Sequence, residues 1–125
     1  MEFDGNRPIY LQLYETIRKQ IAAGELIPGE KLESVRNLAK IYGVNPNTVQ
    51  RALQELEREA LIETDRTRGK FVTENKDTID TLGKDAFFDA CDQLIDVAAD
   101  LSMTQETAVK LLNKRWEKGG SHEGR

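Results

Sequence analysis

Apolar residues recur at helical spacing in the N-terminal half of the chain, in segments bounded by residues that start or stop helices. This pattern predicts three helices, over residues 9–23, 35–42 and 46–59. Ser34 and Asn45 stand where a helix N-cap is needed, because their short polar side chains can accept the free amide hydrogens of the first turn.

The third predicted helix has two unlike faces. At 100° per residue, its apolar side carries Val49, Ala52, Leu53 and Leu56. The opposite side carries the amides and guanidinium of Asn47, Gln50, Arg51 and Gln54. One face therefore packs against a core while the other is free to contact a partner.

Two runs rich in β-forming residues follow, at 61–64 and 70–73. The connection over residues 65–69 ends in Gly69, which can adopt a positive φ. We therefore predict a β-hairpin with a cationic tip. A separate short extended segment is predicted at residues 31–32, before the second helix.

The C-terminal part reads as two helices after a polar linker at 74–77. Thr78 is the predicted cap of a long helix over 79–101, and Thr104 that of a shorter one ending near residue 116. The tail from Lys118 is expected to be loose.

Taken together, these elements predict a mainly α fold with a small β-hairpin. Its two parts are a winged helix-turn-helix at residues 1–77 and a helical hairpin at residues 78–125.

Composition excludes several classes of function. The 125 residues carry 18 Lys and Arg against 22 Asp and Glu, a net charge of −4, which excludes a globally basic nucleic-acid binder. With Cys91 and His122 as the single cysteine and histidine, we expect no metal site, no cofactor and no catalytic residues, and a reducing cytoplasm as the compartment. No apolar run is long enough to span a membrane.

The charge is nevertheless distributed unevenly. Residues 34–51 contain Arg36, Lys40 and Arg51 and no acid, whereas residues 76–125 carry 7 cations and 10 anions. A cationic helix-turn-helix beside a cationic loop suits a phosphate backbone. Accidental charge segregation is the alternative.

The second and third helices carry side chains that can read DNA. Asn and Gln bond adenine in a bidentate way, and Arg does so with guanine, which makes Asn47, Gln50 and Arg51 candidate base-reading residues. Ser34 and Thr48, near helix starts, suit phosphate contacts. An ordinary solvated helix face is the alternative, and the hairpin directly after the helix favours a winged helix-turn-helix.

A specific resemblance rests on motifs that occur in order over about residues 7–73. These are PIY at residue 8, GELIPGEKL at 24, SVRNLA at 34, VNPNTVQRA at 44, QELE at 54 and GKFV at 69. Together they resemble the N-terminal DNA-binding domain of the GntR family of bacterial transcription regulators. The resemblance implies a winged helix-turn-helix on a dimer that binds a double-stranded DNA operator.

The resemblance also implies positions for the DNA contacts. They are Ser34, Arg36, Asn45, Asn47, Thr48, Gln50, Arg51 and, around the wing, Arg66, Arg68, Gly69 and Lys70. The chain departs from the family pattern at Glu33, where a proline is usual, at Asn37, where an acid is favoured, and at Ala60, where glycine is frequent. The wing also differs in its glycine count and register.

The short C-terminal part resembles that of the YtrA-like branch, in which a helical hairpin dimerises the protein. Independently, the apolar stripe of the long helix is larger than a simple tail needs. The predicted homodimer interface comprises Leu82, Phe87, Cys91, Leu94, Ile95, Ala98, Leu112 and Trp116. Packing of this hairpin onto the first helix of the same chain is the alternative.

The favoured function is that of a sequence-specific transcription regulator, a dimeric repressor of a roughly palindromic operator. The YtrA-like resemblance implies control of a transport operon, especially one for an ATP-binding-cassette exporter. A winged-helix protein-interaction module is the alternative, and the sequence identifies no small-molecule effector. An enzyme is disfavoured, because no acid–base pair, metal spacing or phosphate loop occurs.

Overall fold

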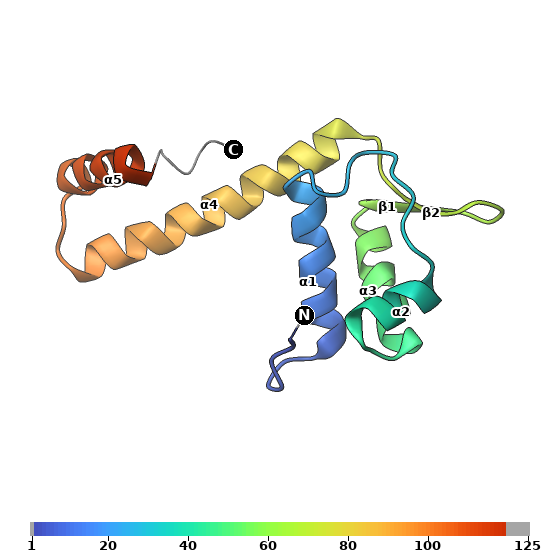
Figure 1. Ribbon diagram of the computed structural model, residues 1–125. Coiled ribbons are helices and arrows are strands. Elements are labelled where there is room, and N and C mark those ends of the chain that lie inside the picture. The colour runs from blue at the N-terminus through green and yellow to red at the C-terminus, as the bar shows by residue number, and fades with distance from the viewer. Residues whose placement is uncertain (1, 120–125) are drawn as a thin grey trace. The chain divides into compact units, whose positions relative to one another are not determined.

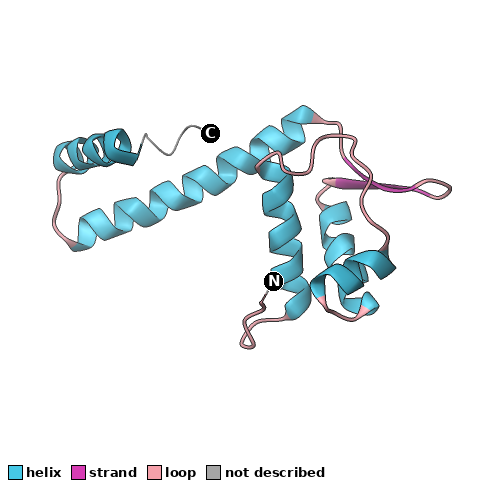
Figure 2. Ribbon diagram, viewed as in Figure 1, coloured by secondary structure: helices cyan, strands magenta, loops and turns pink. Residues whose placement is uncertain are grey.

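Within residues 2–119, which the computed structural model describes, five helices and one β-hairpin form the fold (Figures 1 and 2). The elements are α1 (Ile9–Ala22), α2 (Val35–Tyr42), α3 (Pro46–Arg58), β1 (Ile62–Asp65), β2 (Gly69–Val72), α4 (Lys76–Asp100) and α5 (Gln105–Gly119). This order confirms the mainly α fold with a small hairpin. His122 and the rest of the tail beyond residue 119 lie outside the described residues.

Side-chain caps start the helices where the sequence predicts them, with one exception. The Ser34 hydroxyl accepts the Asn37 amide hydrogen at 3.1 Å, and the Thr104 hydroxyl accepts that of Thr107 at 3.2 Å. Thr78, however, is not the cap of α4. The Asn75 carboxamide oxygen accepts the Thr78 amide hydrogen at 3.2 Å, so the helix begins earlier and absorbs part of the predicted linker.

The ends of four helices share one backbone arrangement. One or two residues beyond each helix, a residue has a positive φ, and the next amide donates to a carbonyl of the last turn, as in a Schellman motif. Gly24 and Gly43 fill this position after α1 and α2 with φ of 81° and 68°. Ala60 and Ser102 fill it after α3 and α4 with φ of 62° and 55°, although a side chain there costs free energy.

The hairpin is extended by a third segment of chain. β1 and β2 pair antiparallel, with Ile62 opposite Val72. On the free edge of β2, the Leu32 amide donates to the Lys70 carbonyl at 2.8 Å, and the Val72 amide donates to the Glu30 carbonyl at 2.9 Å. The extended piece predicted at residues 31–32 therefore anchors the base of the wing.

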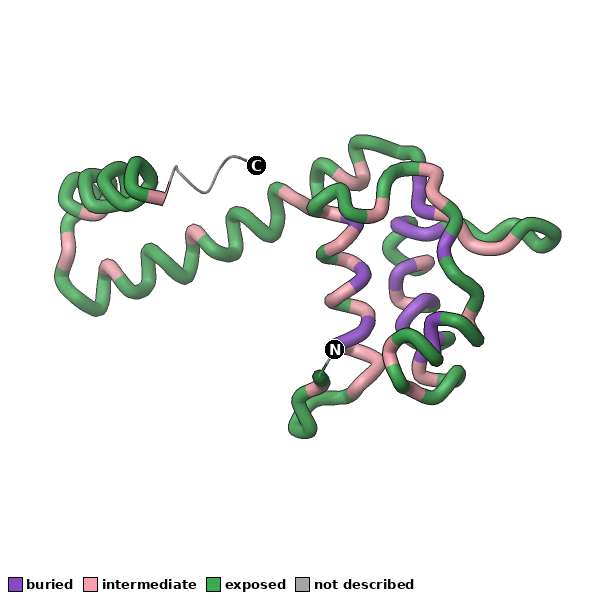
Figure 3. The backbone as a smooth tube through the Cα atoms, viewed as in Figure 1, coloured by how far each residue is buried: buried purple, intermediate pink, exposed green. Residues whose placement is uncertain are grey.

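The hydrophobic core of the N-terminal part lies between α1, α2, α3 and the hairpin (Figure 3). The apolar face predicted for α3 is buried, at Val49, Ala52, Leu53 and Leu56. Leu13, Ile17 and Ile21 of α1 face it. Burying this face of α3 leaves its amide-bearing face exposed.

The chain divides into two compact units, residues 1–84 and 85–125. The first turns of α4 belong to the first unit, because Leu82 is 5% exposed and lies in its core, with Ile79 packed against that core. Leu82 was predicted to lie in the dimer interface, but in the structure it packs in the core and holds the start of α4 on the winged helix-turn-helix.

The second unit contains the rest of α4 and all of α5. Because α5 continues to Gly119, the prediction of a loose tail from Lys118 is wrong for residues 118 and 119. None of the helices within residues 2–119 is both long and apolar enough to cross a membrane. In the same range, no group of three or more His, Cys, Asp or Glu is arranged to hold a metal ion.

Candidate nucleic-acid interface

The start of α3 presents polar side chains from a rigid helix. The Asn45 carboxamide oxygen accepts the Asn47 amide hydrogen at 2.7 Å, so the Asn45 side chain is used as the helix cap. Asn47 and Gln50, near the start of the helix, are exposed, whereas Thr48 is half-buried. The side chains of Asn47 and Gln50 are therefore available to contact base edges, while the Asn45 side chain is used to cap the helix.

The Arg51 side chain is exposed to solvent, and it also contacts an aromatic ring of α1. Its guanidinium carbon lies 3.8 Å from the centroid of the Tyr10 ring of α1, within the range of a cation–π contact. In the structure the Tyr10 ring is half-buried and supports a predicted DNA-binding side chain.

The start of α2 adds an exposed cation beside a capped helix end. Ser34 is exposed, and its hydroxyl makes the cap described above. Arg36 is also exposed and, within the described residues, its side chain forms no ion pair. Glu33 accepts a hydrogen bond from the Asn37 carboxamide at 3.1 Å, so the acid that departs from the family pattern has a partner on α2.

The turn of the wing is built on Asp65. Its carboxylate accepts hydrogen bonds from the Thr67 amide at 2.9 Å, the Thr67 hydroxyl at 2.8 Å and the Arg68 amide at 3.1 Å. These bonds, led by the one from the Thr67 amide, lower the pKa of Asp65. The carboxylate is thus ionised at neutral pH and fixes the loop.

The two arginines of the wing differ in their surroundings. The Arg68 guanidinium lies 5.0 Å from the Phe71 ring centroid, and its Nε is 3.9 Å from the Asp65 carboxylate. Arg66, at the tip, is exposed and forms no ion pair or hydrogen bond among the described residues. Gly69 ends the loop with a φ of 107°, which accounts for glycine there.

Lys70 lies at the junction between the wing and α3. Its ammonium donates to the Glu57 carboxylate of α3 at 3.2 Å and to the Thr64 hydroxyl at 2.9 Å, and its side chain is 22% exposed. Desolvation alone would raise the pKa of Glu57, but hydrogen bonds from Thr64 and Lys70 lower it. Lys70 therefore joins the wing to α3, and its charge is already neutralised.

A groove of about 590 Å³ opens between the wing and the start of α2. Its lining brings Lys31, Ser34 and Arg68 to one surface. Lys31 is not among the DNA contacts predicted from the sequence. Pairing of residues 31–32 with β2 puts this cation beside the wing, and only the extended piece itself was visible in the sequence pattern.

The residues predicted for a dimer interface lie mostly in the second unit. Phe87, Leu94, Ile95, Leu112 and Trp116 are exposed, Trp116 at 67%, while Cys91 and Ala98 are half-buried. Between α4 and α5, an apolar groove of about 540 Å³ is lined by Cys91, Leu94, Ile95, Ala98, Leu112 and neighbouring residues. The hairpin thus leaves much of its apolar surface uncovered.

Comparison with known proteins agrees with this arrangement. The model of the bacterial regulatory proteins of the gntR family matches residues 9–72, which span the three N-terminal helices and the hairpin. The chain belongs to the GntR family. It is therefore a transcription regulator with a DNA-binding winged helix-turn-helix, and not an enzyme.

Similarity to individual family members extends beyond the DNA-binding part. The chain is 34% identical over 119 residues to the uncharacterized HTH-type transcriptional regulator YhcF of Bacillus subtilis, covering 95% of this chain and 98% of YhcF. It is 48% identical over 77 residues to the transcriptional repressor YtrA of the same species, covering 62% of this chain and 59% of YtrA. A GntR family regulator from Listeria monocytogenes matches structurally with a TM-score of 0.81 and 38% identity, over 90% of this chain and 98% of that one.

Proposed function

We propose that this GntR-family regulator is a dimeric repressor that binds a palindromic or pseudo-palindromic operator, in the cytoplasm of a bacterium. The proposal rests foremost on Asn47 and Gln50, which are exposed at the start of α3. Arg36 of α2 and Arg66 of the wing add exposed cations without an acidic partner in the described residues. Amides suit adenine edges, and unpaired cations suit phosphates.

The wing and α2 contribute phosphate contacts in this proposal. Three exposed cations are available for this role. Arg66 lies at the wing tip, Arg36 lies at the start of α2, and Lys31 lines the groove between the wing and α2. Lys70 is left out of the contact set because its ammonium is paired with Glu57. Binding that depends on such cations weakens steeply as salt rises.

A second copy of the chain is the proposed occupant of the apolar surface of the second unit. Phe87, Leu94 and Ile95 of α4 and Trp116 of α5 are exposed, and such large apolar patches on single chains usually mark an interface. The distribution of charge also favours a second copy of the chain, because the two helices carry side chains of opposite charge that could pair between copies. α4 carries a face of Asp85, Asp89, Asp92, Asp96 and Asp100, and α5 carries Lys110, Lys114, Arg115 and Lys118.

Dimerisation has a consequence for the DNA. Two identical reading heads related by a twofold axis require two half-sites with matching symmetry. The operator is therefore expected to be an inverted repeat with its half-sites on the same face of the duplex.

The proposed repression and the proposed class of controlled genes rest on the similarity to YtrA. The matched protein is named a transcriptional repressor, and it shares 48% identity over 77 residues with this chain. Control of a transport operon that includes an ATP-binding-cassette exporter is carried over from the YtrA-like branch, and the residues themselves identify no effector.

Fluorescence anisotropy with the DNA upstream of the protein's own coding region tests the proposal, against a scrambled duplex over a salt series. Gln50→Ala should reduce the preference for the native fragment by at least about fivefold, because each bidentate base contact is worth about 1–3 kcal/mol of discrimination. Gln93→Ala, the same change at an exposed position of α4, should leave the preference unchanged. Absence of binding to either duplex at low salt would favour the protein-interaction module.

Light scattering of the full chain tests the dimer. The wild-type mass should correspond to two chains at micromolar concentration, and Ile95→Asp should shift it toward one chain, because it places a charge on the apolar surface. A wild-type mass of one chain would refute this part of the proposal.

A further inference from the structure

The contact between Tyr10 and Arg51 links the first helix to the DNA-reading helix. Tyr10 lies in the first turn of α1, and Arg51 lies on the exposed side of α3. The distance of 3.8 Å from the guanidinium carbon to the ring centroid places the cation directly against the ring. A flexible side chain is thereby held in one region of space before DNA is present.

This contact leaves the binding groups of Arg51 available. A cation–π contact uses the flat face of the guanidinium, whereas its N–H donors point outward in the plane of the group. No hydrogen bond or ion pair occupies those donors among the described residues. Arg68 is different, since it combines its ring contact with an acidic neighbour, Asp65.

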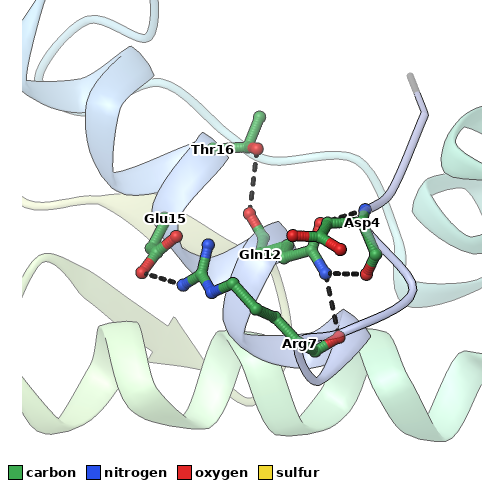
Figure 4. A network of polar contacts seen from close by, with 5 residues as sticks. All are labelled: Asp4, Arg7, Gln12, Glu15 and Thr16. Carbon is green, nitrogen blue, oxygen red and sulfur yellow. Dashed lines mark hydrogen bonds and ion pairs between the residues drawn. The ribbon is translucent and has the colours of Figure 1, made fainter.

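A network of polar contacts, drawn in Figure 4, ties the residues before α1 to the start of this helix. The Gln12 carboxamide, on a buried residue, accepts the Asp4 amide hydrogen at 2.7 Å and donates to the Asp4 and Arg7 carbonyls at 2.6 and 2.9 Å. Arg7 also pairs with Glu15 at 2.7 Å. The N-terminal arm therefore stiffens the first turn that carries Tyr10.

We propose that Tyr10 is a positioning residue for DNA recognition, which holds the guanidinium of Arg51 in the orientation that contacts the operator. The inference rests on the proposed operator binding. Ordering a long side chain on binding costs conformational entropy, and a side chain ordered in advance avoids that cost. Arg51 should consequently bind DNA more tightly with the Tyr10 ring in place than without it.

The first experiment examines the contact in the free, full-length protein. In a proton NMR spectrum, the δ protons of Arg51 should be shifted upfield by the ring current of Tyr10. The shift should persist in Tyr10→Phe, which keeps a ring, and vanish in Tyr10→Leu. An unchanged Arg51 shift in Tyr10→Leu would overturn the proposal.

The second experiment is a double-mutant cycle with the operator fragment, measured by anisotropy at fixed salt. Tyr10→Leu should weaken binding by about two- to fivefold in the wild-type background, the range expected for an exposed cation–π contact. It should have no effect in an Arg51→Ala background, and Tyr10→Phe should bind as the wild type does. Tyr14→Leu is the matched control, because the Tyr14 hydroxyl contacts Glu59, not Arg51, and its effect should add to that of Arg51→Ala.

The outcomes separate this inference from the proposed function. If the wild type binds its operator and the effects of Tyr10→Leu and Arg51→Ala are additive, Tyr10 has no positioning role although operator binding stands. If the wild type binds neither duplex, operator binding fails and the role of Tyr10 fails with it.

Discussion

The wing offers a test in which two nearby cations should behave in opposite ways. Lys70 and Arg66 both lie in the cationic hairpin, and both were predicted as DNA contacts. In the structure, Lys70 is paired with Glu57 and Thr64, whereas Arg66 has no partner among the described residues. We therefore expect Lys70→Ala to change stability and Arg66→Ala to change DNA binding.

The size of each effect follows from the contacts. A cation that neutralises one phosphate contributes about 0.9 to the slope of log K against log salt. Because the proposed dimer carries two wings, Arg66→Ala should reduce that slope by about 1.8, a factor of about twelve in affinity as salt rises from about 50 to 200 mM. Loss of Lys70 removes a partly buried ion pair at 3.2 Å, worth about 1 kcal/mol, which corresponds to about 4–8 °C in Tm for a unit of this size.

Anisotropy over a salt series and thermal melts by circular dichroism measure both quantities on the same variants. Arg58→Ala is the control, because Arg58 is an exposed cation near the end of α3 and should alter neither quantity substantially. Lys70→Ala would contradict this expectation if it lowered the salt slope as much as Arg66→Ala does while leaving Tm unchanged. That result would mean that Lys70 leaves Glu57 for a phosphate.

Three further changes probe other parts of the fold. Ala60→Gly should stabilise the protein by about 1 kcal/mol, because φ is 62° after α3 and glycine adopts this conformation without a Cβ clash; a lower urea midpoint would contradict this. Leu82→Ala should destabilise the first unit by about 2–5 kcal/mol with the dimer mass unchanged, whereas Ile95→Ala should weaken the dimer and leave the first unit intact. The pKa of Glu57 is lowered in the fold, so its stabilisation is present above its unfolded pKa of about 4.3 and is lost as pH falls through the folded value. Glu57→Gln should accordingly make urea stability less sensitive to pH between about 5 and 3, and an identical dependence in both proteins would argue against the Glu57 contacts.

Local sequence signals were sufficient for the helices and the wing. Ser34, Asn45 and Thr104 cap helices as predicted because a cap is decided by one side chain and the amides just after it. The periodicity of α3 separated its buried side from its polar side, since a helix that packs on one core must be apolar on one face. Asn75 was missed as the cap of α4 because Thr78 offers the same chemistry only a few residues later.

Contacts between distant segments were decided by the tertiary structure alone. Three contacts join elements that are separate in the sequence. Lys70 pairs with Glu57, and Arg51 lies against the Tyr10 ring. Lys31 lies beside the wing. Leu82 belonged equally well to a dimer stripe or to the core by its spacing, and only the packing of α4 on the first unit assigned it to the core. Residue type and spacing along the chain thus determined the elements and the kind of ligand. Which cations remain free to meet DNA depends on neighbours that only the folded chain brings together.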